Sequence, residues 1–200
     1  MAASTASRAA APGEGDAEPR RPARVLCLGN DLIADAALGI AAARRLCRRL
    51  AADGAPIPAG PAFDPAATVR AFDHPRAGRV EVVETALTGM YLLEAVVGAS
   101  RLIVVDTVVT GSAEPGTVAV LGEEDFTSAP GGSPHYVGLF EALELARGLG
   151  LDVPAAVVIV AVEAGDHLTV GGEITAPVGA AVPEVVEQVM ALLTGVVAGT

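Results

Sequence analysis

The stretch RVLCLGNDLIADAALG, residues 24–39, constrains the fold of this chain more than any other segment. The apolar run Val25 to Leu28 ends at Gly29, which is typical of a short buried strand. Apolar residues at helical spacing begin near Asp35, and residues 36–52 are predicted to form a helix. A strand, a loop and a helix in this order indicate entry into a parallel sheet, and loops at this place build the sites of open α/β sheets.

Later apolar runs predict the remaining elements. Strands are expected at residues 80–84, 102–105, 117–121 and 156–162, and helices at residues 87–97, 133–150 and 183–197. Only turn residues separate the strands 102–105 and 117–121, so that pair can be antiparallel. The Pro- and Gly-rich segment 53–78 is expected to be irregular, with His74 solvated in it, and residues 123–132 to be a polar loop. The order predicts a three-layer α/β sandwich, with a twisted, mostly parallel five-stranded sheet and helices on both faces.

The domain organisation follows from composition. Residues 1–23 consist mainly of Ala, Ser, Gly, Pro, Glu and Arg, which cannot bury enough apolar surface to become ordered, so a disordered tail is predicted. Residues 24–197 have the length of a single domain with a full core.

Charge and cysteine content exclude several classes of protein. A net charge of −11 disfavours nucleic-acid binding, which needs a basic surface. Cys27 and Cys47 lack CxxC spacing and are expected to be free thiols in a reducing compartment. No uninterrupted apolar run reaches about 18 residues and no signal-peptide core is present, so we expect a cytoplasmic protein without a membrane span.

Polar residues that could carry chemistry gather at one predicted edge of the sheet. The first loop contains Asn30, Asp31 and Asp35, Asp106 follows a buried strand as its last residue, and His135 opens a helix. A carboxylate next to core residues needs a partner or a metal, and carboxylates with histidine bind transition metals well. Structural roles also fit these residues: Asp35 as the N-cap of the first helix, Asp106 as a loop hydrogen-bond partner and His135 as a satisfied helix residue.

Several short motifs, in order, resemble those of the [NiFe]-hydrogenase maturation endopeptidases. The first has Gly29, Asn30, Leu32, Asp35 and Gly39 in the family's GNxLxxD(D/E)xxG pattern. The others are residues 80–90, where Glu84-Thr85-Ala86-Leu87 stands in place of the family's Asp-Gly-Gly-Thr, residues 102–106 with 115–117, and residues 133–139. The resemblance covers roughly residues 24–193.

This resemblance implies a specific activity, a single cut that removes the C-terminal extension of a hydrogenase large subunit after nickel insertion. The resemblance also implies that the enzyme recognises the nickel of the substrate and needs no organic cofactor. The expected partner is the large-subunit precursor, and the protein is expected to be a monomer. The family's second and third functional side chains map onto Asp106 and His135, which become the expected metal ligands. The family's first carboxylate falls on Ala36, so Asp35 is expected to complete the catalytic set, with Asp31 as the other candidate.

Other functions stay open. Ala36 and the altered segment 84–87 are compatible with a non-catalytic relative that binds a hydrogenase subunit as a chaperone or checkpoint, and so regulates an enzyme. The sequence contains neither GxGxxG nor GxxxxGK(S/T), the glycine-rich motifs of nucleotide-binding sites. It also has no GxSxG motif, which carries the nucleophilic serine of many hydrolases. His167, in the glycine-rich loop 163–175, could approach the same edge of the sheet or be an exposed loop residue.

Overall fold

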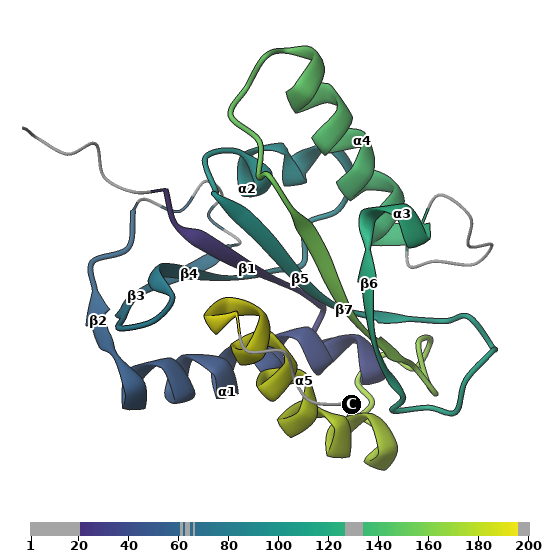
Figure 1. Cartoon of the computed structure of the whole chain (residues 1–200). Coiled ribbons are helices and arrows are strands. Elements are labelled where there is room, and N and C mark those ends of the chain that lie inside the picture. The colour runs from purple at the N-terminus through teal and green to yellow at the C-terminus, as the bar shows by residue number, and fades with distance from the viewer. Residues whose placement is uncertain (1–20, 61, 63–64, 66, 127–133, 196–200) are drawn as a thin grey trace, which may run out of the picture.

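The structure is a computed structural model that describes residues 21–60, 62, 65, 67–126 and 134–195. In this part of the chain seven strands form one sheet, flanked by helices (Figure 1). The strands are β1 (Ala23–Leu28), β2 (Ala55–Ile57), β3 (Thr68–His74), β4 (Gly78–Thr85), β5 (Arg101–Val108), β6 (Val118–Gly122) and β7 (Val157–Glu163). The α-helices are α1 (Leu38–Asp53), α2 (Leu93–Val96), α3 (Glu123–Phe126), α4 (Pro134–Gly148) and α5 (Ala176–Thr194), with 3₁₀ turns η1 (Ala34–Ala37) and η2 (Gly89–Leu92).

The sheet has the order β2-β3-β4-β1-β5-β7-β6. Its four central strands β4, β1, β5 and β7 are parallel, whereas β2, β3 and β6 run antiparallel to their neighbours at the two edges. The predicted α/β sandwich with a mostly parallel centre is therefore confirmed. The sheet has seven strands instead of the predicted five because β2 and β3 extend one edge.

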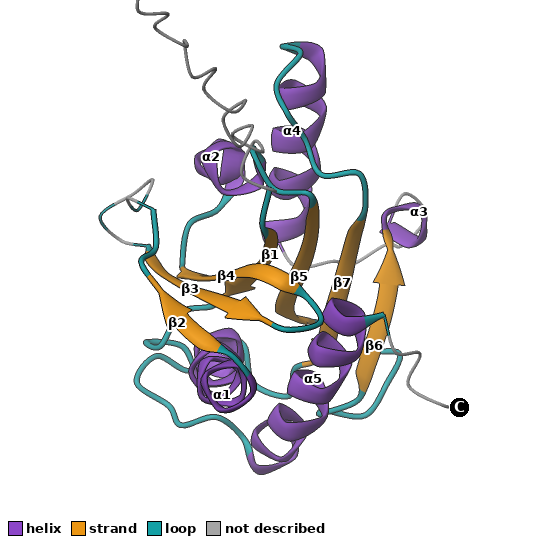
Figure 2. Ribbon diagram, turned by 60° about the vertical axis from the view of Figure 1, so that its left-hand side comes forward, coloured by secondary structure: helices purple, strands orange, loops and turns teal. Residues whose placement is uncertain are grey.

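Helices cover both faces of the sheet and create two separate cores (Figures 1 and 2). Val25 and Cys27 of β1 face α1 and α5, whereas Leu26 and Leu28 face α2 and α4. This alternation is the two-residue period of a strand. It also fixes the sides of β5, where Val104 belongs to the core under α2 and α4. Every second residue along β5 points to that same side.

The segment 53–78 is not irregular, and this prediction is wrong. It contains β2 and β3, and β3 pairs antiparallel with β4 through the turn 75–77. His74 is not solvated either: it is 4% exposed, and its Nδ1 accepts hydrogen bonds from the amides of Arg76 (3.3 Å) and Ala77 (3.1 Å). This histidine therefore closes the β3–β4 turn.

Several element boundaries also differ from the predicted ones. Pro183 lies inside α5, which begins at Ala176, so this proline does not mark the start of the helix. The predicted helix 87–97 is reduced to η2 and the single turn of α2. The strand β6 pairs antiparallel with β7, and not with β5, at the edge of the sheet. A short helix, α3, occupies the start of the predicted loop 123–132, most of which is outside the described residues.

Residues 21–23, at the end of the predicted tail, contact the rest of the structure. Ala23 is the first residue of β1, the carbonyl of Pro22 accepts a hydrogen bond from the amide of Ser100 at 2.8 Å, and Arg21 pairs with Asp152. The rest of the predicted tail, residues 1–20, lies outside the described residues.

Among the described helices, α5 alone is long and apolar enough to cross a membrane by length and composition. It packs across the sheet beside α1, and its inward residues Val178, Val185 and Val189 belong to the core (Figure 2). These contacts are those of a core helix.

Candidate functional site

The first motif forms the turn from β1 into α1. Gly39 lies so close to the end of β1 that a Cβ atom there would stand 1.8 Å from the carbonyl oxygen of Leu28. Asn30 closes the turn: its amide donates to the carbonyl of Ala36 at 3.0 Å, and its side-chain oxygen accepts from the amide of Leu32 at 3.0 Å. Gly39 and Asn30 therefore serve the shape of the loop.

Asp35 is fully buried, and both oxygens of its carboxylate are occupied. Oδ2 accepts hydrogen bonds from the amides of Gly165 (2.8 Å) and Asp166 (2.7 Å) and from the hydroxyl of Thr175 (3.1 Å). Oδ1 accepts one from the amide of Thr175 at 2.7 Å. This carboxylate ties the first loop to the loop 164–175, which is far away in the sequence.

Main-chain contacts strengthen the connection between these two loops. The amide of Asp35 donates to the carbonyl of Asp166 at 3.0 Å, and Ile33 forms an isolated bridge with Val170. Asp35 is not the N-cap of α1, since Ala37 occupies that position. Asp35 therefore anchors the first loop to the loop 164–175.

Asp106 is also buried, at 1% exposed, although it does not end its strand, because β5 continues to Val108. Its Oδ1 accepts a hydrogen bond from the amide of Thr107 at 2.8 Å. Asp106 lies opposite Ala161 of β7, and by alternation with Val104 it faces the side of the sheet that α2 and α4 cover. It is near the carboxyl edge of the parallel strands, as predicted.

The helix α4 begins at this same edge. A Cβ atom on Gly138 would stand 2.2 Å from the Cα of Gly89, which follows the carboxyl end of β4, so two glycines allow the backbones to touch. His135 is the second residue of α4, but its side chain is outside the described part. The structure therefore brings Asp106 and the start of α4 to one edge and one face of the sheet.

The motifs contain two further carboxylates, Glu84 and Asp31. Glu84 is the Cα partner of Cys27 and so faces α1, on the side of the sheet opposite to Asp106, where it pairs with Arg44 at 3.6 Å and Arg70 at 3.3 Å. Asp31 is exposed on the turn after β1.

Glu163, the last residue of β7, is a site residue that the sequence interpretation missed. It is 5% exposed and lies opposite Val108, on the same face as Asp106. Its carboxylate accepts hydrogen bonds from the amides of Thr110 (2.9 Å) and Gly111 (2.8 Å) and from the Thr110 hydroxyl (2.7 Å). Its position after a buried apolar strand, the same signal that singled out Asp106, could have identified it. Glu163 holds the loop 109–116 against the edge of the sheet.

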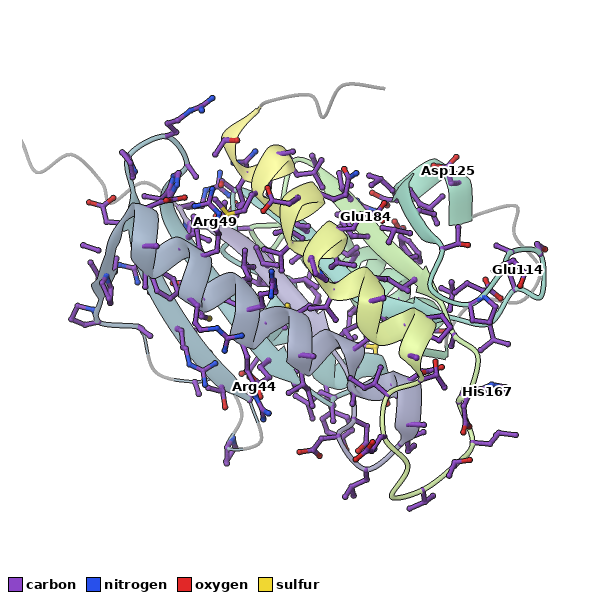
Figure 3. All side chains as sticks on the ribbon, turned by 90° about the horizontal axis from the view of Figure 1, so that it is seen from below. Arg44, Arg49, Glu114, Asp125, His167 and Glu184 are labelled. Atoms are coloured by element: carbon purple, nitrogen blue, oxygen red, sulfur yellow. The ribbon has the colours of Figure 1, made fainter. Side chains whose placement is uncertain are left out.

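Two loops therefore frame the carboxyl edge, one held by Asp35 and the other by Glu163. Figure 3 shows Glu114 and His167 on these loops at the same end of the molecule. His167 is exposed, and hydrogen bonds from Thr169 and Leu168 lower the pKa of the neighbouring Asp166. Within the described residues, no three His, Cys, Asp or Glu side chains are arranged to hold a metal ion.

The cysteines carry no reactive thiolate. Both are free, and burial raises the pKa of Cys27 far above its usual range, with smaller contributions from Cys47 and Glu84. Burial also raises the pKa of Cys47, partly offset by Arg70. Neutral thiols are poor nucleophiles. Cys27 is therefore a core residue.

The sequence also matches a known family. The sequence profile described as "Hydrogenase maturation protease" aligns with residues 68–192, more than half of the chain. The chain belongs to this family. The residues that carry the match include β5 with Asp106, the start of α4 and most of α5.

Individual relatives agree with this membership. The hydrogenase expression/formation protein HupD of Rhizobium leguminosarum bv. viciae is 32% identical over 117 residues, which cover 57% of this chain and 57% of that protein. The hydrogenase maturating endopeptidase HybD from E. coli is 27% identical, with a TM-score of 0.61 over 86% of this chain and 91% of that one. The [NiFe]-hydrogenase maturation protease HybD from Thermococcus kodakarensis, at 22% identity and a TM-score of 0.60 over 86% and 99%, shares the fold.

Proposed function

We propose that this chain is an endopeptidase that removes the C-terminal extension of a [NiFe]-hydrogenase large subunit after nickel insertion. The observation that carries the proposal is a buried Asp106 on the sheet face under α4, the helix that His135 opens, in a member of the maturation protease family. The proposed partner is the large-subunit precursor. In this proposal the protein acts in the cytoplasm as a monomer.

In this proposal the nickel of the substrate supplies the Lewis acid that polarises the scissile carbonyl or activates a water molecule. Asp106 and His135 would hold this ion, since carboxylate and imidazole ligands bind transition metals well. Alternatively His135 accepts the proton of the attacking water as a general base. Burial of Asp106 supports the first role, because a carboxylate in a site with little water interacts more strongly with a cation.

Loop anchoring supports a recognition role for the edge itself. Asp35 and Glu163 fix two loops at the carboxyl edge of the sheet. On the two segments that Asp35 joins, the large apolar residues Leu32, Leu168 and Val170 are exposed. A fixed loop frame loses little entropy when a protein substrate binds. In this proposal Asp35 shapes the site by anchoring its loops.

A second function is favoured by one observation, the absence of a carboxylate at Ala36. Asp35, the substitute expected from the sequence, accepts four hydrogen bonds from the protein, and Glu84 of the second motif pairs with two arginines. A relative with an incomplete ligand set would bind the large subunit without cutting it, as a chaperone or checkpoint.

The substitution Ala36→Glu separates these functions. If the chain is a degenerate binder, Ala36→Glu gains cleavage of a nickel-loaded precursor that the wild type leaves intact, as measured by the mass of the large subunit. If the chain is an active protease, the wild type already cleaves, and Ala36→Glu changes the rate but does not create the activity. Ala37→Glu, on the same turn, is the matched control and should have no effect in the binder case.

A further inference from the structure

A cavity of about 520 Å³ opens at the amino edge of the central strands, opposite the edge that carries Asp106. The first residues of β1, β4 and β5, namely Ala23, Gly78 and Arg101, all line it. Four of its eight lining residues are arginines and none is acidic. The arginines are Arg21, Arg76, Arg79 and Arg101. The cavity is called the arginine pocket below. Such a concentration of positive charge is unexpected in a chain with a net charge of −11.

Carboxylates inside the protein neutralise only part of this charge. Arg21 pairs with Asp152, and Arg79 lies 3.2 Å from Glu81. Glu81 is shared, because Arg24 also contacts it at 2.9 Å. Among the described residues, these two carboxylates are the ones that pair with the arginines of the pocket, while Asp53, Glu184 and Glu187 line a neighbouring cavity that Arg76 also borders.

The other two arginines have no acidic partner in the described part of the chain. Arg101 donates to the main-chain carbonyls of Leu192 (2.7 Å) and Leu193 at the end of α5, which orients its guanidinium without neutralising it. Arg76 is exposed, and its side chain has no hydrogen bond or ion pair with described residues. Among the described residues, the arginine pocket thus contains two arginines without an acidic partner, Arg76 and Arg101, and it has unused N–H donors.

We propose that the arginine pocket binds a small molecule that carries a phosphate or pyrophosphate group. A phosphate monoester has about 1.5–2 negative charges at neutral pH, which matches the two arginines without an acidic partner, whereas one carboxylate would neutralise only one of them. The planar guanidinium fork binds phosphate oxygens in pairs. The cavity is also in the size range of small-molecule sites. This site is separate from the proposed proteolysis and does not depend on it.

Calorimetric titration of the purified full chain with inorganic pyrophosphate tests the proposal. We expect saturable binding at one site, with a Kd that rises about tenfold in Arg76→Gln, because one charge-assisted contact is lost. Arg76 has no internal partner, so the melting temperature of this variant should equal that of the wild type. Arg45→Gln is the matched control: Arg45 is exposed on α1 and does not line the pocket, so its loss should leave the Kd unchanged.

Three results would overturn the proposal. The first is no saturable heat at millimolar pyrophosphate. The second is an equal loss of affinity in Arg76→Gln and Arg45→Gln, which would mean general attraction to charge. The third is a glutamate-rich peptide that binds as tightly as pyrophosphate at the same ionic strength, which would mean that the pocket recognises carboxylates.

Discussion

At the scale of single residues, Asp35 has the role that was hardest to read from the sequence. Its position in the first motif suggested a catalytic carboxylate or a helix cap, yet its hydrogen-bond donors are Gly165, Asp166 and Thr175, 130 to 140 residues further along the chain. No local sequence pattern predicts partners so far along the chain. The buried Asp106, in contrast, was predicted because its neighbours in sequence are themselves buried strand residues.

Replacement of Asp35 should destabilise the fold. Asp35→Ala removes the buried carboxylate that accepts hydrogen bonds from the amides of Gly165, Asp166 and Thr175, so we expect the free energy of unfolding to fall by about 2–4 kcal/mol. Proteolysis of the native protein within the loop 164–175 should become faster. Asp31→Ala, at an exposed position of the same turn, should change stability by no more than about 0.5 kcal/mol. Equal effects of the two variants in denaturant titration would contradict the anchor role.

The raised pKa of Cys27 predicts that the free energy of unfolding falls at alkaline pH. An unfolded thiol ionises near about pH 8.5, whereas burial raises the pKa in the folded state, so the unfolded chain loses its proton first. The stabilisation is complete below about pH 8.5 and declines above it, by up to about 1.4 kcal/mol per pH unit.

Denaturant titrations at several pH values test this slope. Cys27→Ala should be less stable at neutral pH because a core side chain is lost, but its stability should depend less on pH above about 8.5. Cys47→Ala should reduce the alkaline slope less than Cys27→Ala does, because the Cys47 thiol is only partly buried and Arg70 offsets part of the rise in its pKa. The same alkaline slope in the wild type and in Cys27→Ala would show that Cys27 does not cause it.

At the scale of elements, the buried parallel strands were predicted well and the edge strands poorly. β1, β5 and β7 are almost continuously apolar, so their sequences can be read without tertiary information. β2 is three residues long and contains a proline, and β3 mixes exposed and buried residues, so both gain their structure from pairing with a neighbour. Pro183 was misread as a helix start because its effect inside α5 is overridden by the packing of that helix on the core.

The contact between β1 and α1 depends on Gly39. We expect Gly39→Ala to destabilise the protein by about 3 kcal/mol or more, because its Cβ would overlap the carbonyl of Leu28 and separate the two elements. Gly179→Ala is the matched control on α5: its Cβ would meet only Ile174, at 3.7 Å, so stability should rise by up to about 1 kcal/mol. Similar thermal shifts in both variants would exclude the close approach as the reason for the glycine.

At the scale of the whole molecule, the two edges of the sheet carry different chemistry. The carboxyl edge has the buried carboxylates Asp106 and Glu163 between anchored loops, and the amino edge has the arginine pocket. The α/β sandwich and the place of the carboxyl-edge site followed from the order of elements, because parallel strands bring their ends together. The arginine pocket did not, since its residues come from three separated segments and none belongs to a motif.

The most direct test of the central claim is mass spectrometry of a nickel-loaded hydrogenase large-subunit precursor after incubation with this chain. We predict that the precursor loses the mass of its C-terminal extension, and that Asp106→Asn and His135→Gln abolish the loss while Glu114→Gln, on an exposed loop position, retains it. Melting temperatures of the variants confirm that they are folded. A stable complex with the precursor and no loss of mass would contradict the protease and favour the binding protein.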